Sequence, residues 1–248
     1  METFTIKDLK DCDKEIMNNT LYGREFKLIE DCLNAYPNNN DIKIVAMKIG
    51  LIDITNSTHI SQHKGRISVD ELTNYIVNIK DIDKRLRSGD PCLVNEIASP
   101  NKNINLFSFA SKYCFYHNFC VYKKDDYSIY DTILQKNLPN YFDDVTSYAI
   151  EKWRNNKDYK KYNDYITNKL DELGIIDGCR KHLLDHYIWF KNREETSKKV
   201  NSKDNINPKT EMAVEALKKL GEESIKNETS NMTLEEINAE IDAARKNK

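Results

Sequence analysis

Glycine and proline are scarce in this sequence, with 7 and 5 among 248 residues. Tight turns between short β-strands depend on these two residue types, so their scarcity disfavours an all-β fold. No stretch approaches the roughly eighteen apolar residues of a membrane-spanning helix, and the start of the chain has no apolar signal segment. We therefore expect a mainly α, compact multi-helix protein of the cytoplasm that does not contact a membrane.

Paired cysteine motifs and an excess of basic charge are also missing. The six cysteines are scattered without a C-x2-C pair, so the sequence predicts free thiols and neither a disulfide framework nor a zinc ribbon. The net charge is -2. Because proteins that grip DNA through their overall charge are basic, any DNA-binding face here must come from local clustering.

Aromatic residues are absent from one part of the chain. All 14 tyrosines, 8 phenylalanines and 2 tryptophans precede residue 194, and the mean hydropathy of the whole chain is low, at -0.73. A core without aromatic or many large aliphatic side chains is hard to build in so short a segment. The sequence therefore predicts a helical globular domain at 1–195, a polar linker at 196–210, and an amphipathic helical tail at 211–248.

Helical periodicity dominates the predicted domain. A capping box, Ser68-x-x-Glu71, marks the start of one helix. The apolar pattern predicts helices over residues 25–36, 41–54, 68–79, 81–87, 90–97, 104–122, 132–137, 141–156, 158–173 and 178–195. The segment 104–122 is the most apolar, and we expect it to be the central core helix.

Lys112 and Asp131 form the most interesting pair of candidate site residues. A lysine near the start of the most apolar helix can point into a groove, where desolvation or a neighbouring cation makes its amine a nucleophile. Asp131 precedes the helix predicted at 132–137, so it can accept backbone N–H bonds as an N-cap and also stabilise a developing positive charge. The plainer alternative is a solvated lysine and an ordinary helix cap.

The segments around these two residues, Phe109-Ala-Ser-Lys-Tyr-Cys and Ser128-Ile-Tyr-Asp-Thr-Ile, resemble the catalytic stretch of the helix-hairpin-helix DNA glycosylase superfamily. The resemblance implies a glycosylase-like fold, with Lys112 as the Schiff-base nucleophile on the sugar carbon. It implies Asp131 as the carboxylate that supports departure of a base flipped out of the duplex. The family's glycine-rich hairpin is missing at 104–111, and its four-cysteine cluster loop is missing too, so no cofactor is expected.

A second candidate is a basic and aromatic cluster that follows this segment. Its cationic members are Lys152, Arg154, Lys157, Lys160, Lys161 and Lys169, interleaved with Tyr159, Tyr162 and Tyr165. Cations and aromatic rings together are typical of nucleic-acid-binding surfaces. The alternative is a solvated helix face, since Glu151, Asp158 and Asp164 lie among them.

Metal binding has weaker support in the sequence. Three motifs have spacings found in metal sites: His59 with His63, His182 with His186, and Cys114-x2-His117-x2-Cys120. No third ligand can be identified for either histidine pair. One continuous helix does not place three ligands around an ion. We therefore expect no metal.

The end of the predicted tail, Met232-Thr-Leu-Glu-Glu-Ile-Asn-Ala-Glu-Ile-Asp, resembles the C-terminus of RelB-type antitoxins, which implies a protein partner for residues 211–248. Its apolar stripe of Leu234, Ile237 and Ile241 needs an outside surface. The leading interpretation of the whole chain is a divergent DNA glycosylase/lyase-like protein that acts on or binds DNA. The alternative is a non-catalytic interaction protein, antitoxin-like or a phage- or defence-related regulator.

Overall fold

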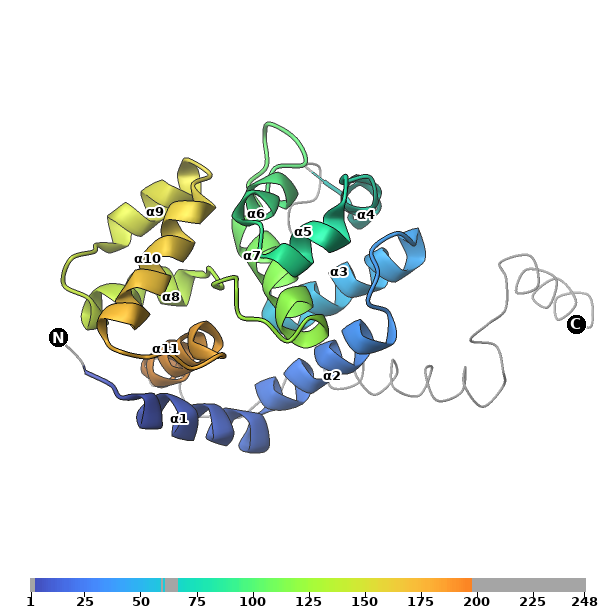
Figure 1. Cartoon of the computed structure of the whole chain (residues 1–248). Coiled ribbons are helices and arrows are strands. Elements are labelled where there is room, and N and C mark those ends of the chain that lie inside the picture. Colours follow the sequence, from blue (N-terminus) through green and yellow to red (C-terminus); the bar gives the residue numbers. More distant parts are fainter. Residues whose placement is uncertain (1–2, 59, 61–66, 198–248) are drawn as a thin grey trace, which may run out of the picture. The chain divides into compact units, whose positions relative to one another are not determined.

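The computed structural model describes residues 3–58, 60 and 67–197 (Figure 1). Within these residues the chain forms eleven α-helices and one π-helix, and no strand occurs. The mainly α fold class is thereby confirmed. The chain's contacts group residues 1–201 into one unit. Three predicted features lie outside the described residues: the tail at 211–248, the linker beyond residue 197, and the His59/His63 pair.

The first three helices begin at residues whose side chains cap them. They are α1 (Ile6–Asn19), α2 (Leu21–Ala35) and α3 (Ile42–Asn56). Thr5 and Asp8 form a capping box on α1, Thr20 caps α2, and Asp41 accepts two backbone N–H groups at the start of α3. Periodicity did not predict α1, since its buried stripe consists only of Leu9, Cys12 and Ile16 among charged residues.

The next helices lead to the centre of the domain. They are α4 (Val69–Val77), α5 (Ile82–Ser88), α6 (Pro91–Ile97), α7 (Phe107–Tyr116) and the π-helix η2 (His117–Val121). The predicted capping box of Ser68 and Glu71 is present on α4. Every residue of α7 except Ser108 is buried, which confirms that the core lies here. The single helix predicted over 104–122 is wrong at its ends: residues 104–106 are not helical, and the last turns widen into η2.

An extended segment, residues 123–131, then connects to the last four helices. They are α8 (Thr132–Tyr141), α9 (Ser147–Asn155), α10 (Tyr159–Glu172) and α11 (Arg180–Ser197). Two predicted bounds are wrong. Pro139 lies inside α8, so this helix continues past residue 137. Thr146 then caps α9, so that helix begins at Ser147 rather than at 141.

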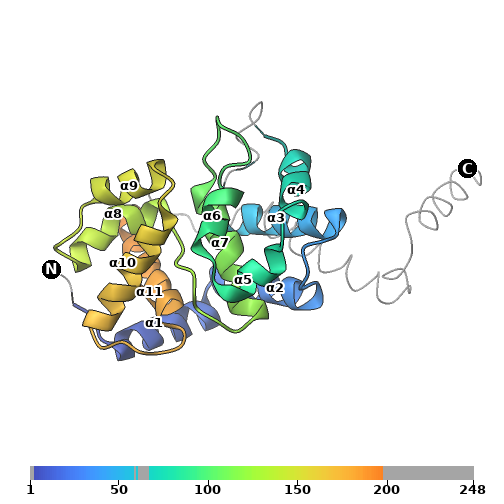
Figure 2. The same cartoon turned by 45° about the horizontal axis from the view of Figure 1, so that its top comes forward.

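The helices form two groups, seen side by side in Figures 1 and 2. One contains α2 to α7, the other α8 to α11, and α1 runs along the second group and leads into the first. Tyr127, Ile129 and Tyr130 of the extended segment are buried as it passes between the groups. No helix in the described part of the chain is long and apolar enough to cross a membrane.

Candidate functional site

Lys112 and Asp131 come together where the two helix groups meet. The amine Nζ of Lys112 lies 3.8 Å from Oδ2 of Asp131. Lys112 projects from the first turns of α7, and Asp131 is the residue directly before α8. A hydrogen bond ties the segment before α8 to α7: the Tyr130 N–H donates to the Ser111 hydroxyl at 3.0 Å. The lysine and the aspartate therefore face one common point.

The two carboxylate oxygens of Asp131 have different partners. Oδ1 accepts the N–H groups of Ile133 at 2.9 Å and Leu134 at 2.8 Å, as expected of an N-cap. Oδ2 is the oxygen that faces Lys112. Asp131 thus caps its helix and still presents one charged oxygen to the site.

Lys112 is almost completely buried, with 8% of its side chain exposed. Its amine donates to the Ser108 hydroxyl one turn earlier on α7, at 3.4 Å. A buried cation needs compensation from partners. Asp131 supplies the charge and Ser108 supplies a further polar contact.

A second carboxyl group, Asp185 of α11, belongs to the same electrostatic environment. Burial raises its pKa well above the usual value, the charge of Asp131 raises it further, and the charge of Lys112 opposes both. These surroundings therefore favour the protonated form of Asp185. Its Oδ1 is buried without a hydrogen-bond partner in the described part of the chain.

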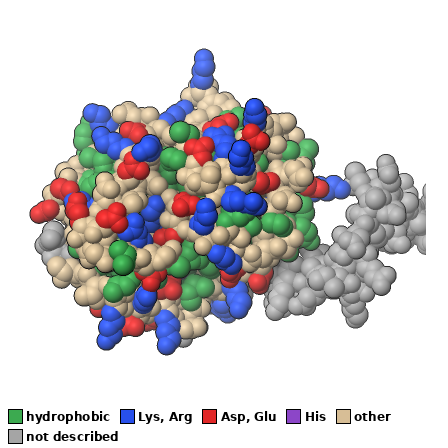
Figure 3. All heavy atoms as spheres, in the orientation of Figure 1, with side chains coloured by type: hydrophobic (Ala, Val, Ile, Leu, Met, Phe, Trp, Pro, Cys, Tyr) green, Lys and Arg blue, Asp and Glu red, His purple; other side chains and the backbone are tan. Residues whose placement is uncertain are grey.

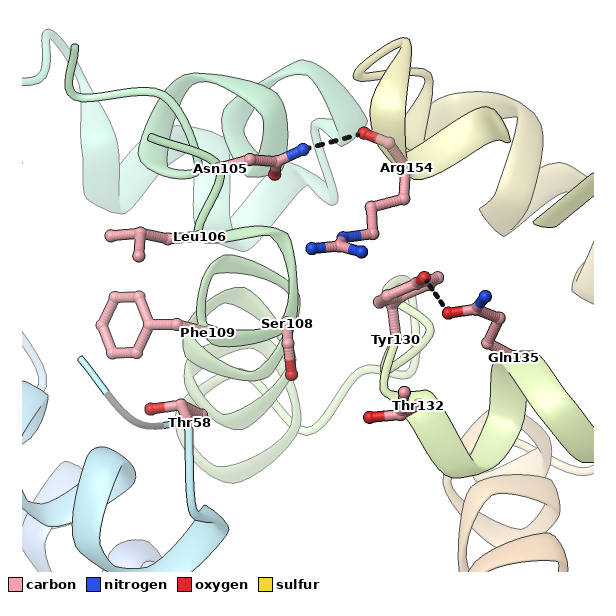
Figure 4. A pocket seen from close by; sticks show the side chains of 9 residues that line it. All are labelled: Thr58, Asn105, Leu106, Ser108, Phe109, Tyr130, Thr132, Gln135 and Arg154. Atoms are coloured by element: carbon pink, nitrogen blue, oxygen red, sulfur yellow. Dashed lines mark hydrogen bonds between the residues drawn. The ribbon is translucent and has the colours of Figure 1, made fainter. Parts of the chain in front are cut away.

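A pocket opens beside the pair, between the two groups of helices (Figure 4). Its volume is about 170 Å³. It is lined by Thr58, Asn105, Leu106, Ser108, Phe109, Tyr130, Thr132, Gln135 and Arg154. Typical sites for drug-sized ligands measure roughly 300–1,000 Å³, so this one suits a small planar group rather than an extended ligand. Ser108 connects the pocket with the buried amine behind it.

The walls of the pocket combine aromatic and polar groups. Phe109 is on one side, and Tyr130 donates a hydrogen bond to Gln135 Oε1 at 2.8 Å on the other (Figure 4). Burial raises the pKa of Tyr130 to about 12, so the phenol stays a hydrogen-bond donor. The Arg154 guanidinium extends from α9 into the space between these walls (Figure 4). The sequence pointed to Arg154 as part of a DNA-binding cluster but gave no signal for Gln135.

The other members of the predicted basic cluster lie in different surroundings. Lys160 and Lys161 line a separate open hollow of about 440 Å³, together with Trp153 and Tyr165. Lys161 lies 5.7 Å from the Trp153 ring centre. Lys160 pairs with Asp164 of the same helix.

The predicted basic cluster has three further lysines. Lys152 is exposed in the last turn of α9, and Lys157 occupies the turn after it with a positive φ of 55°. Lys169 pairs with Asp144 and Glu172, each at 2.6 Å. Figure 3 shows basic and acidic side chains interleaved over the visible face. Arg154 thus lines a different pocket from Lys160 and Lys161, and two of the five lysines, Lys160 and Lys169, form ion pairs with acidic side chains.

The structure also supplies a partner for the His182/His186 pair. Asp13 of α1 directs Oδ1 at both rings, 3.2 Å from His182 Nε2 and 2.6 Å from His186 Nδ1. In the described residues, this is the one group of three or more histidine, cysteine or acidic side chains with converging donor atoms. The Cys114-His117-Cys120 motif does not form such a group. Asp13 went unnoticed in the sequence because α1 was not expected.

Comparison with known proteins gives similarity over the first half of the chain. Residues 5–126 match the model of a protein family, HI_0787_N, described as an N-terminal domain. An uncharacterized protein of Haemophilus influenzae is 33% identical over 135 residues, which is 52% of this chain and 60% of that relative. The chain thus covers less than two thirds of the relative's length. No solved structure matches.

The family match begins directly before α1 and ends at residue 126, within the extended segment. It includes Lys112 and stops before Asp131. The resemblance to helix-hairpin-helix glycosylases, which joins both residues, stays a prediction.

Proposed function

We propose that this protein is a divergent DNA glycosylase/lyase-like enzyme that acts on a base turned into the pocket between the two groups of helices. The observation that carries the proposal is the 3.8 Å approach of Lys112 Nζ to Asp131 Oδ2 beside a small polar and aromatic pocket. A nucleophile and its supporting carboxylate must reach one reacting centre, and a separation of 3.8 Å is compatible with that.

In the proposed reaction the Lys112 ammonium gives one proton to the departing base. The lone pair that this frees forms a bond to the anomeric carbon while the glycosidic bond breaks, and the base leaves with the electron pair of the glycosidic bond. Asp131 Oδ2 stabilises the positive charge that develops on the sugar. Ring opening then gives an imine between Lys112 and the sugar. A side-chain rotation past Ser108 brings the amine to the pocket.

The pocket walls suit a planar base. Phe109 and Tyr130 offer ring surfaces, and Gln135 and Arg154 offer hydrogen-bond donors. We assign phosphate contacts to the exposed Lys152 and to Lys157, Lys160 and Lys161. DNA as substrate places the enzyme in the cytoplasm, and the free state of all six cysteines fits that compartment.

Borohydride trapping tests the proposal directly. We expect the full-length protein to form a covalent adduct on duplexes that carry an abasic site, because borohydride reduces the imine to a stable amine. Lys112→Gln should abolish the adduct. Lys136→Gln, which changes an exposed lysine on α8, should retain it and serves as the matched control.

Two variants of Asp131 separate its roles. Asn caps helices as well as Asp does but leaves the buried Lys112 without its compensating charge, so Asp131→Asn should stay folded, lose roughly 1–3 kcal/mol of stability and reduce trapping sharply. Asp131→Ala should also lose about 1 kcal/mol of stability with the cap. Full trapping by Asp131→Asn, or no adduct of the wild type on abasic, oxidised or alkylated duplexes, would contradict the proposal.

A further inference from the structure

We propose that Asp13, His182 and His186 form a binding site for one divalent transition-metal ion, of which zinc is the best match. The site lies between the first and the last described helices, apart from the Lys112/Asp131 pair, and the inference does not depend on the proposed glycosylase activity.

The geometry of the three donor atoms is the first argument. In tetrahedral zinc sites with metal–ligand distances of about 2.1 Å, donor atoms lie about 3.4 Å apart. His182 Nε2 is 3.2 Å from Asp13 Oδ1, and all three donor atoms lie within 4.8 Å of one another. His186 Nδ1, at 2.6 Å from the same oxygen, needs only to move back by a fraction of an ångström.

The chemistry of the donor set is the second argument. Two imidazoles and one carboxylate match the three protein ligands of open zinc sites, with a fourth position for water. His182 and His186 are one turn apart on α11, the spacing at which two histidines chelate one ion. Asp13 has a side chain 26% exposed, so ion and water have a way in.

The outer nitrogens of the two rings supply a separate observation. His182 Nδ1 and His186 Nε2 are buried, and neither has a hydrogen-bond partner in the described part of the chain. These nitrogens point away from Asp13, so each can carry its ring's proton when the nitrogen that faces Asp13 binds an ion. Without an ion, His186 Nδ1 hydrogen-bonds to Asp13 Oδ1, so a bound cation takes the place of that proton.

Aromatic rings surround the two histidines on the side that faces the protein interior, and they keep water away from that side. The rings of Phe26 and Phe119 lie 5.2 and 4.5 Å from His182, and Tyr22 lies 5.2 Å from His186. In such an apolar wall the attraction between cation and carboxylate is strong. A bound ion therefore joins α1 to α11, and it stabilises the folded state over the unfolded one.

Cobalt and zinc titrations of the full-length protein test the inference. We expect one equivalent of Co2+ to give visible d–d bands without a thiolate charge-transfer band, because the ligands are nitrogen and oxygen. We expect Zn2+ at a hundredfold excess over its Kd to raise the melting temperature by about 5–10 °C. Asp13→Asn and His186→Gln should each weaken binding at least tenfold, whereas Asp11→Asn, an exposed change on α1, should not.

Several results would overturn the inference. They are the absence of stoichiometric binding by the wild type, a cobalt spectrum dominated by thiolate ligands, and unchanged binding by both folded variants. Circular dichroism shows whether the variants fold. If they do not, the wild-type cobalt spectrum decides, since cysteine ligation contradicts the site and nitrogen–oxygen ligation supports it.

Discussion

Lysine and aspartate side chains with little exposed surface rarely occur in proteins without a partner. In this domain Lys112, Asp131 and Asp185 share one electrostatic environment, but the two carboxyl groups have different hydrogen-bond partners. Asp131 is held by two backbone N–H groups. Asp185 has no such donors at its Oδ1, and its pKa is raised by burial. Neighbouring carboxyl groups with such different surroundings are a feature of sites that handle protons.

The raised pKa of Asp185 has a measurable consequence for stability. Its folded-state pKa lies above the unfolded value of about 3.9, so its contribution is fully present below pH 4 and is lost as pH rises. Asp185→Asn removes this dependence, and the variant should gain on the wild type by up to about 1.4 kcal/mol per pH unit above pH 4. Urea unfolding of both proteins between pH 4 and pH 8 measures the difference.

The exposed Asp11→Asn change provides the control for that series. Parallel stability curves for wild type and Asp185→Asn would show that Asp185 is ionised in the folded protein. A raised pKa of Asp185 in the folded protein would then be wrong.

At the scale of elements, two glycines in helices have opposite structural roles. Gly23 in α2 faces the end of α1, where an added Cβ would lie 2.5 Å from the Ile16 carbonyl oxygen and 2.6 Å from that of Met17. Gly50 in α3 has nothing within 4 Å of the same position. The close approach of the two helix backbones explains why residue 23 is a glycine. At residue 50 the structure shows no contact that requires a glycine.

Alanine at each position should therefore change stability in opposite directions. Gly23→Ala should destabilise the domain by about 2 kcal/mol or more, because α1 and α2 must separate. Gly50→Ala should stabilise it by about 0.5–1 kcal/mol through helix propensity. Chemical unfolding measures both. Equal effects of the same sign would mean that α1 does not approach α2 as closely as the structure shows.

The elements also show which features a single sequence can predict. Helices with a strong apolar stripe and a local cap, such as those that begin after Asp41, Ser68 and Asp131, were predictable because both signals are local. Helix α1 was not predictable, since its narrow apolar stripe is buried by packing against α11, which lies far away in the sequence. The π-helix after α7 was missed for a similar reason: widened turns depend on packing that periodicity does not report.

The candidate site divides in the same way. Lys112 and Asp131 were identified by their local context and a resemblance, but their separation of 3.8 Å depends on tertiary structure. Asp185 and Asp13 gave no local signal. Their partners lie on other elements, so only the assembled helices reveal them.

At the scale of the whole molecule, the described domain should be complete without its C-terminal segment. Contacts group residues 1–201 into one unit, and α11 supplies the buried Leu183, Leu184 and Ile188. A chain ended after 201 should keep its melting temperature within about 3 °C, which is about 1 kcal/mol for a domain of this size. A chain ended after 180 should fail to fold. Circular dichroism melts of both compare them with the full chain, and a large loss in the first would contradict the boundary.

The pairing of α1 with α11 has a consequence for how the protein is made. Lys10 and Asp13 of the first helix find Asp177 and His186 only near the end of the domain. At roughly 5–20 residues per second, a ribosome takes roughly 10–30 s to synthesise the stretch between them. During that time α1 is outside the ribosome without its packing partner. The nascent chain thus exposes Leu9, Cys12 and Ile16 to the chaperones that bind unfinished proteins.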